Sequence, residues 1–151
     1  MDRIEMYCDG GCRGNQSDKN IGAWGVYIEY RDVIKKYSDG ERNTTNNIME
    51  LKACIEGMKN IKIKTIPVTV YLDSAYVLNG ITSWITGWKK NGWRSSNKKP
   101  VKNRELWMEL DKLKSEFTDI KFVKVKGHSD NQGNIEADLL CNLKMDEMEV
   151  E

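Results

Sequence analysis

IEMYCDGGCRGN, residues 4–15, decides how the rest of the chain is interpreted. Ile4, Met6 and Cys8 alternate with other side chains, which is the pattern of a strand with one buried face. Glycines follow Asp9, and a glycine-rich turn after a strand commonly cradles a phosphate. A carboxylate at the start of that turn would repel a phosphate, so a positive group is expected between the two.

The composition indicates one globular domain. The chain has 151 residues, of which 39% are hydrophobic and 31% charged, which argues against disorder throughout. No apolar run approaches the roughly 20 residues that cross a bilayer. MDRIEMYCDG does not have the pattern of a signal peptide. We therefore expect a cytoplasmic protein without membrane contact, and reduced thiols at Cys8, Cys12, Cys54 and Cys141.

Charge is segregated along the chain although the net charge is only +1. Residues 84–104 hold seven basic residues and no acid, whereas the last seven residues, MDEMEVE, hold four acids. We interpret residues 1–145 as the folded domain and 146–151 as an acidic, disordered tail. No pattern of a coiled coil is visible, so a monomer without an obligatory protein partner is expected.

Hydrophobic periodicity predicts three strands, a helix, a strand, helices, a strand and a last helix. The strands are expected at 3–9, about 24–30, about 33–38, 67–73 and 119–127. Ile48, Leu51, Ile55 and Met58 form one helical stripe, and Ile135, Leu139 and Leu143 form the apolar face of the last helix. Residues 75–88 are expected to be short helical pieces broken at Gly80 and Gly87. The order predicts an α/β fold, a mixed five-stranded sheet with helices on both faces.

Four acids from separate segments can meet at one end of this sheet. Asp9 and Asp73 end strands that we expect to be parallel neighbours, and the carboxyl ends of such strands form one ligand-binding edge. Glu50 and Asp138 lie on helices. Each has an ordinary alternative: a turn or cap for the strand ends, a capping box Asn47-x-x-Glu50, and a solvated helix face for Asp138.

A cluster of carboxylates needs a compensating cation, and oxygen ligands select Mg²⁺ or Mn²⁺ over zinc. Two such ions about 4 Å apart form a clamp for displacement at phosphorus. A metal ion between Asp9 and a phosphate would offset the repulsion between the carboxylate and the phosphate. The glycines would then let the backbone approach the substrate.

The residues resemble a known family, type 1 ribonuclease H. Five motifs carry the resemblance over about residues 4–145: DGGCRGN at 9–15, TNNIME at 45–50, DS at 73–74, KGH at 126–128 and GNIEAD at 133–138. WITGWKKNGWRSSNKKPVKNRELW, residues 84–107, resembles the basic protrusion of the bacterial enzymes. The resemblance implies a three-layer fold and endonucleolytic hydrolysis of the RNA strand of RNA–DNA hybrids by two metal ions. The products would carry 3′-hydroxyl and 5′-phosphate ends.

The resemblance also implies roles for individual residues. Asp9, Glu50, Asp73 and Asp138 would hold two Mg²⁺ ions, with Mn²⁺ as a substitute, and His128 would assist proton transfer or product departure. The implied substrate contacts are Gly11, Cys12, Asn15, Thr45, Asn46, Asn47, Trp88, Lys89, Lys90, Trp93, Arg94 and Lys99. Two positions depart from the family pattern: Ala75 stands where relatives often have Gln, and Ile135 where they often have an acid.

The basic stretch admits two interpretations. Cations beside aromatic rings suit phosphates and bases, while the tryptophans alone could be packing residues. We expect Trp84 in the core and Trp93 in contact with substrate. Two alternative functions remain open: a hybrid-binding module without catalysis, and another nuclease of the same fold, similar to resolvases or integrases.

Overall fold

The computed structural model describes residues 2–14, 20–125 and 131–151, and is built around one mixed sheet of order β3-β2-β1-β4-β5. β1 (Ile4–Arg13), β2 (Ile21–Tyr30) and β3 (Val33–Arg42) form an antiparallel meander. β4 (Val68–Leu72) pairs parallel to β1, and β5 (Ile120–Lys124) pairs parallel to β4. The α/β class and the mixed five-stranded sheet are confirmed.

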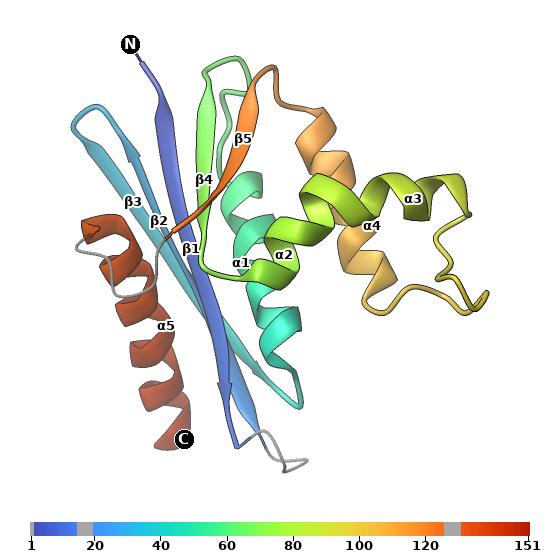
Figure 1. Cartoon of the computed structure of the whole chain (residues 1–151). Helices are drawn as coiled ribbons and strands as arrows, with labels where there is room; N and C mark the ends of the chain where they lie inside the picture. Colours follow the sequence, from blue (N-terminus) through green and yellow to red (C-terminus); the bar gives the residue numbers. More distant parts are fainter. Residues whose placement is uncertain (1, 15–19, 126–130) are drawn as a thin grey trace.

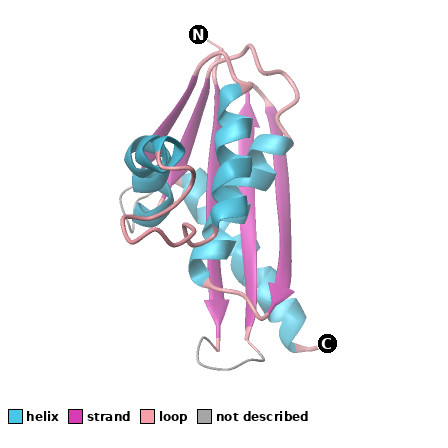
Figure 2. Ribbon diagram, turned by 90° about the vertical axis from the view of Figure 1, so that its right-hand side faces the viewer, coloured by secondary structure: helices cyan, strands magenta, loops and turns pink. Residues whose placement is uncertain are grey.

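Helices cover both faces of the sheet (Figures 1 and 2). One face carries α1 (Asn46–Lys59), α2 (Ala75–Asn79) and α4 (Arg104–Ser115), together with α3 (Ile85–Lys90). The other carries α5 (Gln132–Glu149), which packs on β1, β2 and β3. No helix in the described ranges is both long enough and apolar enough to cross a membrane.

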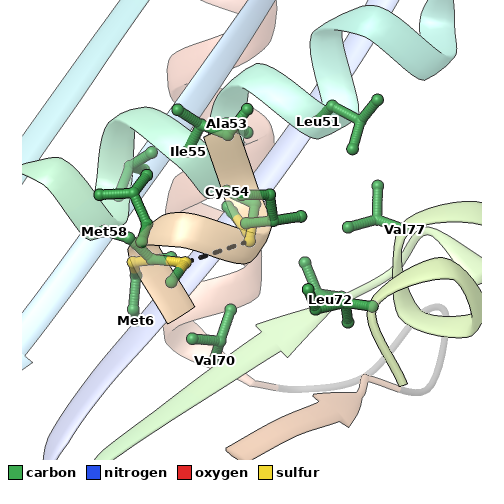
Figure 3. Packing of buried hydrophobic residues seen from close by; sticks show 14 of the residues in the cluster. Met6, Leu51, Ala53, Cys54, Ile55, Met58, Val70, Leu72 and Val77 are labelled. Atoms are coloured by element: carbon green, nitrogen blue, oxygen red, sulfur yellow. Dashed lines mark hydrogen bonds between the residues drawn. The ribbon is translucent and has the colours of Figure 1, made fainter. Parts of the chain in front are cut away.

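The larger core lies between the sheet and α1. Met6 of β1, Val70 of β4 and Ile55 of α1 are among its fully buried side chains (Figure 3). The predicted α1 stripe is buried at Leu51, Ile55 and Met58, while Ile48 is only half-buried. Because side chains separated by three or four positions share one helix face, this stripe anchors α1 to the sheet.

The segment after β4 is more continuous than expected. α2 leads directly into a π-helical turn, η1 (Gly80–Trp84), and then into α3, so Gly80 and Gly87 do not break it. A π-helical turn accommodates an extra residue without ending the backbone hydrogen bonding. The predicted short helical pieces are present, but they follow one another directly, so the predicted breaks at both glycines were wrong.

The expected apolar face of α5 points away from the sheet. Ile135, Leu139 and Leu143 are 46%, 48% and 53% exposed. The buried face consists instead of Gly133, Ala137, Cys141, Met145 and Met148. The residues at the closest approach are small, because a Cβ on Gly25 of β2 would already lie 2.3 Å from the Ala137 carbonyl oxygen and 2.9 Å from the Cys141 nitrogen.

The acidic end of the chain is helical rather than disordered through Glu149. Met148 is 6% exposed and packs with Met145 and Ile21 in a second, smaller core under α5. Burial of Met148 provides an apolar anchor that the charge pattern alone does not reveal. The expected disorder of 146–151 therefore does not hold for 146–149.

Candidate active site

Asp9 and Asp73 lie side by side because β1 and β4 are parallel neighbours. Cys8 pairs with Leu72 in the last parallel pair, so Asp9 and Asp73 come next on their respective strands. Asp73 follows the end of β4 and is exposed, whereas Asp9 is half-buried and pairs with Gly25 of β2. The two side chains thus stand at the edge predicted for them.

The glycines after Asp9 do not form a turn, which corrects the interpretation of the opening stretch. β1 continues through Gly10 to Arg13 alongside β2. A Cβ on Gly10 would lie 2.4 Å from the carbonyl carbon of Met49, so the missing side chain admits the backbone of α1. Close approach to a helix, rather than to substrate, is what this glycine permits.

This close approach also holds Glu50. The Gly10 N–H donates to Oε1 of Glu50 and, at 3.0 Å, to Oδ1 of Asp9. The N-cap of α1 is Thr45, whose Oγ1 accepts from the Ile48 N–H at 3.1 Å. The capping-box alternative for Glu50 is therefore wrong: its carboxylate points to the first strand and not back to the helix start.

Asp138 reaches the same edge from the opposite layer. A Cβ on Gly25 would lie 2.3 Å from the carbonyl oxygen of Ala137, so α5 rests on β2 at the residue paired with Asp9. Asp138 is the next residue of α5, and it lies near enough to Asp9 to raise the pKa of that carboxyl group. Two glycine contacts, at Gly10 and Gly25, thus bring one carboxylate from each helical layer to Asp9.

The electrostatics of the cluster are unfavourable for four bare negative charges. Burial, and then the hydrogen bond and charge of Asp138, raise the pKa of Asp9 to about 7. Burial and the neighbouring charge of Asp9 raise the pKa of Glu50 to about 9, against the hydrogen bond from Gly10, which lowers it. The charge of Asp73 acts on the pKa of both groups in the same upward direction.

This donor set fits hard divalent cations. Within residues 2–14, 20–125 and 131–151, no three acidic, thiol or imidazole side chains already converge on one ion-sized position. Without a cation, burial and the neighbouring charges favour the protonated forms of Asp9 and Glu50, whose pKa values are raised. A cation among these four oxygen donors would favour the ionised forms.

Polar groups gather at the N-terminus of α1. Thr45, Asn46 and Asn47 are exposed and, with Thr44, line a pocket of about 310 Å³. Asn20, which no sequence motif singled out, is 6% exposed and fixes this corner. Its amide donates to the Thr44 carbonyl at 2.7 Å and accepts from the Thr44 N–H at 3.0 Å.

The other substrate-contact candidates lie on β1, on α3 and in the segment that follows α3. Gly11 and Cys12 are half-buried in β1. Lys89, Lys90 and Arg94, hereafter the basic trio, are exposed in and after α3, as is Lys99. Lys89 forms an ion pair with Asp111 of α4 at 3.2 Å, so part of its charge is already compensated.

The tryptophans are arranged differently from the expectation. Trp84 is 41% exposed, so its assignment to the core was wrong. Trp88 is half-buried, and its ring lies 5.3 Å from that of the fully buried Trp107. Trp93, predicted to contact substrate, is half-buried and packs on Trp88 with ring centroids 6.4 Å apart. The i, i+4 spacing of Trp84 and Trp88 did not reveal which ring faces α4.

Asn15 and His128 lie outside the described residues. Of the two departures from the family pattern, Ala75 is the exposed first residue of α2 and Ile135 is exposed on α5.

Comparison with known proteins places the chain in a family. A family model described as RNase H matches residues 1–145. A ribonuclease H from Clostridium botulinum (strain Hall) is 46% identical over 151 residues, covering 99% of this chain and 100% of the relative. A ribonuclease H from Ruthia magnifica is 47% identical over 148 residues, covering 98% and 99%.

Solved structures agree. LC9-RNase H1, a type 1 RNase H with the type 2 active-site motif, superposes with a TM-score of 0.82 at 28% identity, covering 95% of this chain and 72% of that one. The solution structure of the PFV RNase H domain gives a TM-score of 0.75 at 25% identity, covering 95% and 94%.

Proposed function

The chain belongs to the RNase H family and is a ribonuclease H, and we propose that it cuts the RNA strand of RNA–DNA hybrids at the carboxylate edge of its sheet, using two divalent metal ions. One observation carries the proposal. Four carboxylates from two strands and two opposite helical layers meet at this edge, with raised pKa values for Asp9 and Glu50. A group of acids that a fold assembles at a cost in repulsion is the pattern of a cation site.

We assign Asp9, Glu50, Asp73 and Asp138 as the residues that hold Mg²⁺, with Mn²⁺ as a substitute. Bound divalent ions supply charge neutralisation at the phosphate, an activated water and support for the leaving oxygen. The Gly10 N–H keeps Glu50 turned toward Asp9. Attack by water with departure of the 3′ oxygen would leave 3′-hydroxyl and 5′-phosphate ends.

Substrate recognition is proposed for the exposed amides at the start of α1. RNA differs from DNA by its 2′-hydroxyl groups, which the shallow minor groove of an A-like helix displays. Asn46 and Asn47 are exposed on the first turn of α1, and amides both donate and accept hydrogen bonds. Asn15 is proposed to join them, with Thr45 and backbone groups near Gly11 and Cys12 as further contacts.

The basic trio and Lys99 would neutralise phosphates farther along the hybrid, with Trp88 and Trp93 beside them. His128 remains proposed as the group that moves a proton, since an imidazole titrates near neutral pH. Action as a monomer, without an obligatory protein partner, and a cytoplasmic location stay predictions from the sequence.

The test is cleavage of an end-labelled RNA–DNA hybrid by the full chain, with Mg²⁺ and with EDTA. We expect metal-dependent cuts in the RNA strand, and none in duplex DNA or duplex RNA. Asp73→Asn should abolish cleavage while hybrid binding persists, because a ligand is removed without a change of shape. Asp32→Asn, in the exposed β2–β3 turn, is the matched control. Binding without cleavage by the folded wild type, in Mg²⁺ and in Mn²⁺, would instead identify a binding module.

A further inference from the structure

The acidic end of α5 binds the last residue of β1. Arg13 Nη1 donates to Asp146 at 2.7 Å and to Glu149 at 3.0 Å. Its second terminal nitrogen, Nη2, donates to the side-chain oxygen of Asn142 at 3.2 Å. The guanidinium is therefore held by three side chains of one helix face, and its position is set by the C-terminal acids.

Asn142 continues the network toward the active site. Its amide nitrogen donates to Oδ1 of Asp138 at 3.2 Å and to the Asp138 carbonyl at 2.9 Å. Asp138, Asn142 and Asp146 are four residues apart, so they follow one another along one face of α5. The hydrogen bonds thus run without a gap from Asp146 and Glu149 through Arg13 and Asn142 to Asp138.

Arg13 decides which way the Asn142 amide faces. A guanidinium has donors only, so it can bind Asn142 only through the amide oxygen. The NH₂ group must then face Asp138, where it binds a carboxylate oxygen and leaves the other oxygen available. Without Arg13 the amide could turn over and present its own oxygen to the carboxylate.

We propose that Arg13 and Asn142 are positioning residues for Asp138, and that Asp146 and Glu149 act in the same network by holding Arg13. The inference rests on the proposed function, in which Asp138 is a metal ligand. The proposal gives Asp146 and Glu149 a role in positioning, although neither takes part in the proposed cleavage chemistry. Groups that orient a ligand from behind commonly affect metal affinity about 10- to 100-fold when they are replaced.

The chain provides a matched control within the same acidic segment. Glu147 lies between Asp146 and Glu149 in sequence, but its carboxylate pairs with Lys144 at 3.3 Å. Glu147→Gln removes the same charge from the same turn of helix. An effect of net charge alone would therefore appear in this variant as well.

The experiment measures Mn²⁺ affinity of the full chain without substrate, by titration calorimetry, for Asn142→Asp, Arg13→Gln, Asp138→Asn and Glu147→Gln. Asn142→Asp keeps the shape but places an oxygen against Asp138, so we expect affinity to fall about 10-fold. Arg13→Gln should weaken it severalfold, and Glu147→Gln should leave it within about twofold of wild type. Unfolding midpoints in EDTA show that each variant is folded at the temperature used.

A cleavage assay supplies the second readout. Raised Mg²⁺ should restore the cleavage rate of Asn142→Asp, with an unchanged KM for the hybrid, because orientation and not chemistry is impaired. If Asp138→Asn weakens Mn²⁺ binding while Asn142→Asp and Arg13→Gln bind like wild type, the positioning role is wrong and the proposed function stands. If Asp138→Asn binds Mn²⁺ like wild type, the assignment of Asp138 as a ligand fails, and the positioning role fails with it.

Discussion

Asp9→Asn should make the metal-free protein more stable at pH 8 while abolishing its activity. The folded state raises the pKa of Asp9 from 3.8 to about 7. At about 1.4 kcal/mol per pKa unit, ionising this group in the folded protein costs about 4 kcal/mol more than in the unfolded chain. Asp9 is half-buried, so water relieves part of the repulsion, and we expect a gain of about 2 to 4 kcal/mol.

The sign of the pH dependence follows from the direction of the shift. Between pH 4 and pH 7, roughly, the unfolded chain has released the proton that folded Asp9 still holds. Stability of the metal-free wild type therefore falls as pH rises through this window, and the Asp9 contribution becomes constant above it. In Asp9→Asn this contribution disappears, so the slope should flatten. Glu50, whose pKa is raised to about 9, extends a residual slope to higher pH.

Urea denaturation in EDTA at several pH values measures both effects, and Asp32→Asn controls for net charge. Added Mg²⁺ should stabilise wild type at pH 8 and have much less effect on Asp9→Asn, because the ion binds only the folded state. An unchanged pH slope in Asp9→Asn, or a variant less stable than wild type at pH 8, would refute the idea that repulsion at this edge opposes folding.

Three further predictions concern packing and substrate. Gly10→Ala should reduce the free energy of unfolding in urea by about 2 kcal/mol or more and abolish most activity, because its Cβ would lie 2.4 Å from the Met49 backbone; a stable, active variant would contradict this close approach. Trp107→Ala should lower the free energy of unfolding by about 3 to 5 kcal/mol, and Trp84→Ala by only about 1 kcal/mol. Equal losses for the two variants in urea would show that Trp84 is a core residue. Neutralising the basic trio should weaken hybrid binding and lower its salt slope by about 0.9 for each phosphate that these side chains neutralise; an unchanged slope would remove these residues from the interface.

Elements with strong local periodicity could be predicted from the sequence. The mixed five-stranded sheet follows from strands that alternate with helices in the second half of the chain, together with an opening meander. Asp9 and Asp73 could be placed together because the carboxyl ends of parallel neighbours meet. Glu50 and Asp138 needed the resemblance as well, since neither helix position distinguishes a site residue from a solvated one.

Two of the errors share a cause, which is close approach between elements distant in sequence. The local pattern at Gly10 predicts a turn, but β1 stays paired with β2 through this residue and α1 passes over it too closely for a side chain. The last helix has large aliphatic residues on one face and small ones at Gly133, Ala137 and Cys141 on another. Hydrophobicity alone predicts that the face with aliphatic residues is buried. The short distance between α5 and the sheet instead requires burial of the face with small residues.

The position of Asp138 on α5 determines when the proposed site is completed during synthesis of the chain. Asp9, Glu50 and Asp73 lie in or directly after elements that precede β5, whereas α5 follows β5 and leaves the ribosome after all of them. A nascent or C-terminally nicked chain can thus hold three of the four carboxylates in a nearly finished fold. Under the proposed function, in which Asp138 is a metal ligand, the appearance of cleavage would report the docking of α5 on Gly25 and Arg13. Chains without α5 would then be unable to cut RNA.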